Sequence, residues 1–274
     1  MVDVLTFVNG HPINEWSIKT ALLREEKNLQ ELVPSDLFPY DQDHYGGLQA
    51  VKELAEKAGL SGNSNVLDVC SGMGGPARYI SERYGCRVVG LDINEARSLS
   101  AGRLTRWVGL ENAVSFACGD ASNIPFADNT FTHLISQEAF LHIADKESLF
   151  RNSRRVLKAD GRMVFTDWVA SPSLTDQEKN MLRDGMAASG IHTKAEYKNY
   201  ILGAGFNSVE MEDLSSWWAK ILPERLKMYK AKSKEAVEML GLSRFKDFIE
   251  AYGAFVQVME GGNLGGIRFI AYSY

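Results

Sequence analysis

Short apolar runs alternate with helical patterns through the middle of the chain. Five runs have the length of buried strands, and they occupy residues 65–70, 87–92, 114–118, 131–136 and 162–169. Stretches with helical spacing stand between and after them, at 47–60, 77–84, 95–108, 145–157 and 193–203. Because strands that alternate with helices at this spacing form parallel sheets, the pattern predicts an α/β fold. We expect a doubly wound sheet with helices on both faces.

The two ends of the chain depart from this pattern. Residues 1–45 carry weaker signals, with a short apolar run at 4–8 and a helical stretch from about residue 14 to 32. A sixth strand is expected at 208–214, then mostly helical residues and a glycine-rich link into a last strand at 267–272, which could pair antiparallel at an edge. The prediction is one domain of seven strands over residues 1–274, with these parts: a helical N-terminal cap (1–45), the core (46–214), a lid inserted before the last strand (215–263) and that strand (264–274).

The composition narrows the class of protein. With 274 residues, 45% hydrophobic and 24% charged, the chain is long enough to bury a core without disulfides or metals. The net charge is −5, whereas a dedicated nucleic-acid-binding protein is expected to carry a net positive charge. The three cysteines have no metal-binding spacing, no apolar run approaches about 18 residues, and no basic segment precedes the first apolar run. We therefore expect a cytoplasmic protein that binds neither nucleic acid nor metal and does not insert into a membrane.

A glycine-rich turn follows the first expected strand. Gly72 and Gly74 allow a tight turn and a close approach to a ligand, and the helix after them offers unpaired N–H groups. Asp92 ends the next strand, where an acidic side chain accepts hydrogen bonds from the two hydroxyls of a ribose. Together they favour a ribose-containing ligand over a turn that serves packing alone.

Two further acids bear on the identity of this ligand. Asp68 lies in the first strand, where a carboxylate would repel a pyrophosphate but suits the α-amino group of an amino-acid-like ligand. Asp120 follows the third strand and is placed to meet an adenine amino group. A carboxylate at each of three strand ends therefore indicates S-adenosylmethionine rather than a dinucleotide.

Several segments of the chain resemble those of a known family. The segments VLDVCSGMGG (66–75), VVGLDI (88–93), CGDA (118–121), IPFADNTF (124–131) and RVLKADGRMVFTD (155–167) resemble those of class I S-adenosylmethionine-dependent methyltransferases. This resemblance implies a Rossmann-like methyltransferase sheet and an enzyme that releases S-adenosylhomocysteine. The segments DQDHYGG (41–47), SQEAFLHI (136–143) and DLSSWWAKIL (213–222) are similar to sarcosine/dimethylglycine N-methyltransferases and to phosphoethanolamine methyltransferases.

The resemblance also implies which residues bind the cofactor. Nine positions match the family's motifs: Asp68, Gly72 and Gly74 for the methionine part, Asp92 and Ile93 for ribose and adenine, Asp120 and Ala121 for adenine, Gln137 beneath the sulfonium, and His44 in a segment that closes over the carboxylate.

Two candidate catalytic residues, Glu138 and His142, follow the fourth strand. Methyl transfer needs an aligned nucleophile, and a protonated amine must also lose a proton. His142 titrates near neutral pH and matches the histidine with a catalytic role in the similar phosphobase enzymes, although their partner tyrosine has no clear counterpart here. The alternative is that His142 only shapes the pocket. Glu138 either orients an amine, binds His142 or starts a helix.

Three tryptophans are candidates for binding the acceptor. Trp168 follows the fifth strand, and Trp217 and Trp218 follow the sixth. Aromatic faces stabilise methylated ammonium groups through cation–π attraction, which suits a product that is a quaternary amine. The alternative interpretation is that adjacent tryptophans anchor the lid helix on the sheet.

The sequence leaves several classes of small molecule as candidates for the methyl acceptor. An amine such as sarcosine or dimethylglycine comes first, and its carboxylate would need a cation from the lid region, such as Arg225, Arg183 or Lys220. An apolar natural product methylated on carbon or oxygen comes second. A phosphobase is third, because residues 184–191 contain no arginine, lysine or tyrosine. The intact glycine turn with its acids argues against a non-catalytic binding module. The N-terminal segment could cover its own site as a monomer or a neighbour's in a homo-oligomer.

Overall fold

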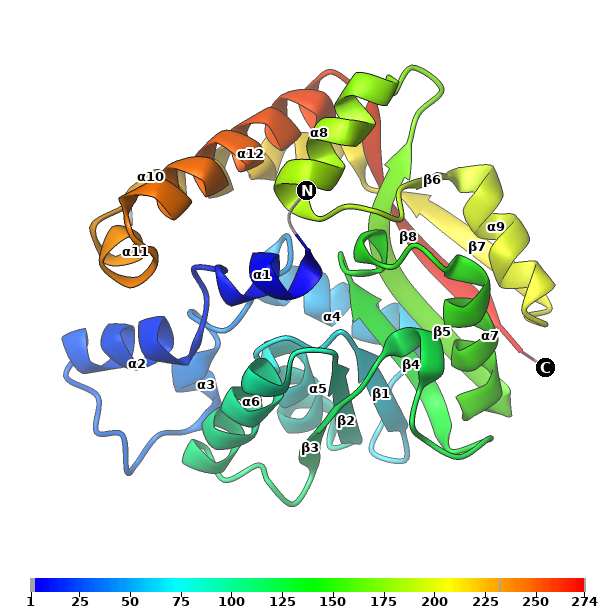
Figure 1. Ribbon diagram of the computed structural model, residues 1–274. Helices are drawn as coiled ribbons and strands as arrows, with labels where there is room; N and C mark the ends of the chain where they lie inside the picture. Colours follow the sequence, from blue (N-terminus) through cyan, green and yellow to red (C-terminus); the bar gives the residue numbers. More distant parts are fainter. Residues whose placement is uncertain (1–2, 232, 274) are drawn as a thin grey trace.

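A central sheet lies between helices on both faces, and a further helical layer covers one end of it (Figure 1). This computed structural model describes residues 3–231 and 233–273. The strands are β1 (Asn65–Val69), β2 (Arg87–Asp92), β3 (Val114–Cys118), β4 (Phe131–Gln137), β5 (Leu157–Ala170), β6 (His192–Thr193), β7 (Ser208–Asp213) and β8 (Leu264–Tyr272). Their order is β3-β2-β1-β4-β5-β8-β7, and β6 pairs with β5. The pairs from β3 to β5 are parallel, which confirms the doubly wound α/β fold.

The last strand is antiparallel, as expected, but the prediction that it lies at an edge is wrong. β8 pairs antiparallel with both β5 and β7, so that β7 takes the edge. Most residues of β8 are buried, whereas those of β7 are exposed or half-buried. The more apolar strand therefore occupies the interior position. Gly265 and Gly266, expected in a flexible link, belong to β8 itself.

Helices pack on the two faces of the sheet through separate apolar cores. On one face, α4 (Gly47–Ala58) and α5 (Gly75–Tyr84) pack against β1, β2 and β4. On the other, α7 (Lys146–Val156) and α9 (Lys194–Gly203) pack around Phe165 and Phe269. α6 (Glu95–Trp107) contacts β2 and β3. These elements agree with the predicted ranges to within a few residues, because a local apolar pattern specifies each of them.

The N-terminal segment forms the short helices α1 (Val4–Asn9), α2 (Glu15–Arg24) and α3 (Pro34–Leu37). Of these, α1 borders a cavity at the strand ends, whereas α2 contacts α6 and α3 contacts α5. The helix predicted from about residue 14 to 32 is too long. It ends at Arg24, and Glu26 then takes a left-handed φ of 57°, which breaks the helical path.

A second helical layer, which we call the lid, consists of α8 (Asp176–Met186), α10 (Ser215–Ala231), α11 (Ser233–Leu240) and α12 (Leu242–Glu260). α8 was not predicted, and neither was the short strand β6. In Figure 1 the lid lies above the strand ends, and α1 lies between it and α6. An apolar cluster around Trp168, Trp218 and Phe255 joins α8, α10 and α12 to the end of β5.

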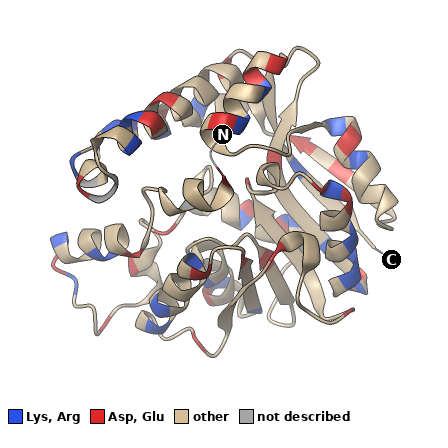
Figure 2. Cartoon of the chain, viewed as in Figure 1, with Lys and Arg blue, Asp and Glu red and all other residues tan. Residues whose placement is uncertain are grey.

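Three features of the described residues concern possible partners: the surface charge, the apolar character of the helices and the grouping of metal-binding side chains. Figure 2 shows Lys and Arg scattered among Asp and Glu along the helices. None of the described helices combines the length and the apolar character needed to cross a bilayer. Within residues 3–231 and 233–273, no group of three or more His, Cys, Asp or Glu side chains is arranged to hold a metal ion.

Candidate active site

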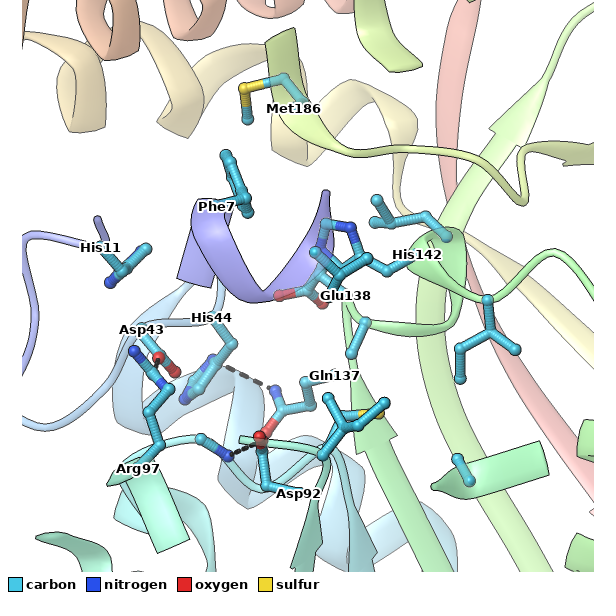
Figure 3. A pocket seen from close by; sticks show the side chains of 18 of the residues that line it. Phe7, His11, Asp43, His44, Asp92, Arg97, Gln137, Glu138, His142 and Met186 are labelled. Carbon is cyan, nitrogen blue, oxygen red and sulfur yellow. Dashed lines mark hydrogen bonds and ion pairs between the residues drawn. The ribbon is translucent and has the colours of Figure 1, made fainter. Parts of the chain in front are cut away.

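A cavity of about 370 Å³ opens at the carboxyl ends of the strands, between the sheet, the N-terminal segment and the lid. Figure 3 shows its walls, with α1 running across it. The cavity brings together most of the residues expected to contact a cofactor: His44, Gly72, Asp92, Ile93, Asp120, Ala121 and Gln137. Asp68 and Gly74 are not in its lining. Both candidate catalytic residues, Glu138 and His142, lie on its wall.

The turn after β1 needs glycine because two of its residues have left-handed backbone conformations. Gly72 and Gly74 have φ values of 53° and 76°, in the left-handed region that glycine tolerates. A Cβ on Gly74 would lie 2.4 Å from the Phe116 ring, so a side chain has no room there. Asp92 fixes the turn from the next strand, since its Oδ2 accepts the Gly72 N–H at 2.8 Å and its Oδ1 accepts the Asn94 N–H at 2.9 Å. Each oxygen keeps a lone pair that can accept from a ligand hydroxyl.

Two buried acceptor atoms beside this turn have no partner among the described residues. They are Asp68 Oδ2 and Gln137 Oε1. Burial, together with the charges of Asp43 and Asp92, raises the pKa of Asp68 to about 8. A buried acceptor without a donor is costly, and a cationic group such as an ammonium would satisfy it. Gln137 on the cavity wall, together with Asp68 in the neighbouring strand outside the lining, therefore suits the amino-acid part of the expected cofactor.

The segment before α4 closes one side of the cavity and is held by arginines from three helices. Arg78 of α5 forms a fully buried ion pair with Asp41 at 2.9 Å. Arg97 of α6 pairs with Asp43. Arg225 of α10 donates to the carbonyl oxygens of Asp43 and His44, at 2.6 and 2.9 Å. Core and lid thus meet on this segment.

His44 and Gln137 face each other across the cavity floor. Their Nδ1 and Nε2 atoms lie 3.1 Å apart (Figure 3). His44 Nε2 lies 2.8 Å from the side-chain oxygen of Gln42. Burial lowers the pKa of His44 to about 4, so the imidazole is neutral at pH 7.

His142 projects from a single 3₁₀ turn, Phe140–His142, between β4 and α7. Its Nδ1 lies 3.0 Å from the carbonyl oxygen of Ala187. Because a carbonyl only accepts, Nδ1 carries the proton and Nε2 is left as the basic nitrogen. Burial lowers the pKa of this imidazole to about 4, so it is neutral at pH 7. The Phe7 ring of α1 lies 5.5 Å from the imidazole, which it covers.

Glu138 is bound to the protein at both oxygens. Its Oε2 accepts the Tyr45 N–H at 2.7 Å, and its Oε1 accepts the Thr166 hydroxyl at 2.5 Å. Burial raises its pKa to about 8, and its backbone has a φ of 43°. Neither hydrogen bond goes to His142. The geometry shows a side chain that ties the N-terminal segment to the ends of β4 and β5.

Of the three candidate tryptophans, Trp168 alone lines the cavity. Its ring stacks on Phe255 of α12 at 4.2 Å, and its indole N–H is buried without a partner among the described residues. The ring of Trp218 lies edge-on to the Tyr45 ring and covers Gly266. Trp217 lies over Gly46. These two positions match the alternative interpretation, in which they anchor the lid helix.

Several cavity residues were not singled out from the sequence. They are Phe7 and His11 from the N-terminus, Asp43 before α4, Met186 of α8, Tyr229 of α10, and Phe248 and Tyr252 of α12. The hydroxyl of Tyr252 is buried and has no partner among the described residues. Phe248, Tyr252 and Phe255 fall at helical spacing, a signal that would have marked one face of α12. Nothing in the local pattern marks Met186 or Asp43.

Comparisons with known proteins show similarity to one domain family and to several of its members. Residues 67–165 match the family model of a methyltransferase domain. The chain is 29% identical over 79% of its length to the glycine/sarcosine/dimethylglycine N-methyltransferase of Actinopolyspora halophila, of which it covers 38%. It is 31% identical over 82% of its length to phosphoethanolamine N-methyltransferase 1 of Triticum aestivum, of which it covers 45%. The chain thus spans less than half the length of these curated relatives.

A solved structure with a similar fold is described as a putative sarcosine dimethylglycine methyltransferase from Galdieria sulphuraria. The TM-score is 0.74 with 20% sequence identity, over 82% of this chain and 86% of that one. At this level of identity the likeness concerns the fold alone.

Proposed function

From the methyltransferase domain that residues 67–165 form, we propose that this protein transfers a methyl group from S-adenosylmethionine to the nitrogen of a small amine. The acceptor we favour is similar to sarcosine or dimethylglycine and carries a carboxylate. One observation carries the proposal. The buried side-chain atoms without a hydrogen-bond partner among the described residues include two acceptors beside the glycine turn, Gln137 Oε1 on the cavity wall and Asp68 Oδ2 outside the lining, and two groups on the wall that can donate, Trp168 Nε1 and the Tyr252 hydroxyl. The first set suits the ammonium of the cofactor, and the second suits an acidic group on the acceptor.

The chain's own residues can hold each part of the cofactor. Asp92 accepts from the ribose hydroxyls with its remaining lone pairs. Ile93, whose side chain is 47% exposed, offers an apolar surface that an adenine ring would cover. Asp120 lies exposed at the rim and, with Ala121, borders the adenine position. When bound, the cofactor supplies an electrophilic methyl group on a sulfonium.

His142 is the residue we place beside the acceptor nitrogen. With Nδ1 donating to Ala187, the free Nε2 can accept a hydrogen bond from an N–H of the acceptor amine. A pKa of about 4 makes His142 a weak base. It serves best when the acceptor is close to neutral, and it then orients the lone pair rather than removing a proton. Phe7, Trp168 and Met186 exclude water around it.

A mass-spectrometric assay tests the proposal. Purified protein and S-adenosylmethionine with a deuterated methyl group are offered glycine, sarcosine, dimethylglycine, phosphoethanolamine and a cell extract. We expect labelled dimethylglycine or betaine from the amino-acid acceptors. The Asp92→Ala variant should lose both product and cofactor affinity, whereas Asp160→Ala, at an exposed acid remote from the cavity, should keep both.

Other outcomes would reassign the acceptor. A labelled N-methylated phosphoethanolamine would contradict the proposal that the acceptor carries a carboxylate. A labelled product found only in the extract would place the acceptor in another class, such as an apolar molecule methylated on carbon or oxygen. Unchanged cofactor affinity in Asp92→Ala would contradict the ribose assignment.

A further inference from the structure

Every carbonyl of the turn that carries His142 is held by a donor from outside the turn. The oxygens of Phe140 and Ile143 both accept from the Lys146 ammonium, at 2.5 and 2.6 Å. The oxygen of Leu141 accepts the backbone N–H of Gly190 at 2.7 Å, and that of His142 accepts the Ser189 hydroxyl at 2.9 Å.

Lys146 is an unusual residue to find at this place. It is the first residue of α7, its exposed fraction is 1%, and its ammonium lies 5.5 Å from the centre of the Tyr197 ring. A charged amine loses much solvation when it is buried, so it needs strong partners. Two of them are the carbonyls of the turn. The third is the negative charge of Asp167, which supports the ammonium and receives a hydrogen bond from Tyr197.

The segment that contains Gly190 lies directly against both the turn and the ammonium. A Cβ added to Gly190 would lie 2.2 Å from the Ile143 oxygen and 2.3 Å from the Lys146 nitrogen. Residues 187–190 therefore press directly on the turn and the ammonium. From the same segment, the Ala187 oxygen accepts the Nδ1–H of His142. The lysine and this segment, which touch each other, together hold the turn and the Nδ1–H of His142.

We propose that Lys146 is a positioning residue, whose ammonium fixes the 140–143 turn and so directs the His142 imidazole into the cavity. This rests on the proposed function only for its effect on catalysis, because the orientation of His142 can be measured without turnover. Asp167 and Tyr197 support the ammonium, and Gly190 allows the facing segment to approach. Lys146 itself does not line the cavity, so it contacts neither cofactor nor acceptor there.

The test replaces Lys146 with methionine, which keeps the length of the side chain but removes its donors. In Lys146→Met we expect kcat to fall about tenfold or more, while the dissociation constant for S-adenosylhomocysteine stays within about twofold. The matched control is Lys158→Met, an exposed lysine of the same domain, which should change neither.

Two further readouts separate positioning from a general loss of structure. In protein labelled selectively at histidine, the His142 ring resonance, assigned with His142→Ala, should move in Lys146→Met, and the His11 and His133 resonances should not. In a His142→Ala background, Lys146→Met should lower kcat less than about twofold. An unmoved His142 resonance, or an undiminished effect in that background, would overturn the proposal.

The outcomes also distinguish this inference from the proposed function. If His142→Ala is fully active, the catalytic role of His142 fails, and a moved resonance in Lys146→Met still supports the positioning. If Lys146→Met does not fold, Gly190→Ala tests the same contact with the lysine in place. It should displace the same resonance and lower kcat, and an unchanged resonance there would equally overturn the proposal.

Discussion

Asp68 shows how a single buried carboxyl can report on cofactor binding. Its pKa is raised to about 8, so at pH 7 the free protein holds it mostly protonated. An ammonium placed against it would favour the ionised form. Binding should therefore release a proton at pH 7, and the affinity should rise with pH until about pH 8 and then level off.

Calorimetric titration with S-adenosylhomocysteine in buffers of different ionisation enthalpy measures this proton directly. We expect a release of up to about one proton at pH 7 and a gain of up to about fivefold in affinity between pH 7 and 8. Asp68→Asn provides the baseline, because the ligand's own amino group still titrates there. Equal proton release in both proteins would rule out the contact.

Glu138 can be assigned to structure or to catalysis by one pair of variants. In Glu138→Gln, the amide oxygen can still accept from the Tyr45 N–H, and the amide N–H can donate to the Thr166 hydroxyl, which also accepts. We expect activity within about twofold of the parent.

Glu138→Ala should instead leave the Tyr45 N–H without a partner and cost about 1–3 kcal/mol of stability, as measured by chemical denaturation. If Glu138→Gln abolishes turnover while it retains the fold, the carboxylate itself takes part in the reaction.

At the scale of elements, Gly266 decides how the lid helix α10 sits on the sheet. It lies in β8, and a Cβ there would come 2.1 Å from the Trp218 ring. Gly266→Ala should push α10 outward, lower the melting temperature by several degrees and reduce kcat, because α10 also carries Arg225 and Tyr229 to the cavity.

The matched control is Gly203→Ala at the end of α9, where nothing lies within 4 Å of the added atom. That variant should have an unchanged or slightly higher melting temperature. A parent-like melting temperature in Gly266→Ala would mean that Trp218 does not hold the lid.

The sequence predicts the elements whose signal is local. The strand–glycine turn–helix around Gly72 is specified by backbone conformations that glycine alone adopts at low cost. α8 carried a local signal that we did not use, a capping box between Thr175 and Glu178. The interior position of β8 had none, because it depends on which of two strands buries more apolar surface after the sheet assembles.

The residues of the candidate site also fall into those that local sequence predicts and those that it does not. Residues at strand ends, such as Asp92 and Gln137, were predictable because parallel strands gather their carboxyl ends at one edge. Lid residues such as Tyr252, and Asp43 of the N-terminal segment, reach the cavity only through tertiary packing. The separation of Trp168 from Trp217 and Trp218 likewise depends on where α10 lies on the sheet.

For the whole molecule, Arg225 joins the lid to the N-terminal segment. Its guanidinium bridges two backbone carbonyls and the Tyr229 hydroxyl, and it lies 5.7 Å from the centre of the Tyr45 ring. A lysine has no fork with which to bridge the same groups. In Arg225→Lys we expect faster hydrogen exchange in residues 41–46 and a weaker affinity for S-adenosylhomocysteine, by about tenfold.

Lys227→Met, on an exposed part of the same helix, serves as the comparison and should leave both properties as they are. Parent-like exchange in Arg225→Lys would show that the segment closes without the lid.

The place of β8 has a consequence for the order in which the chain assembles. β7 meets the rest of the sheet only through β8, and all of α10 to α12 lies between these two strands in the sequence. During synthesis the strands up to β5 can associate early, while β7 can join the sheet only after β8 has emerged. The edge of β5 that β8 occupies stays open in the meantime, so the synthesis of β8 completes the sheet and seats the lid in a single event.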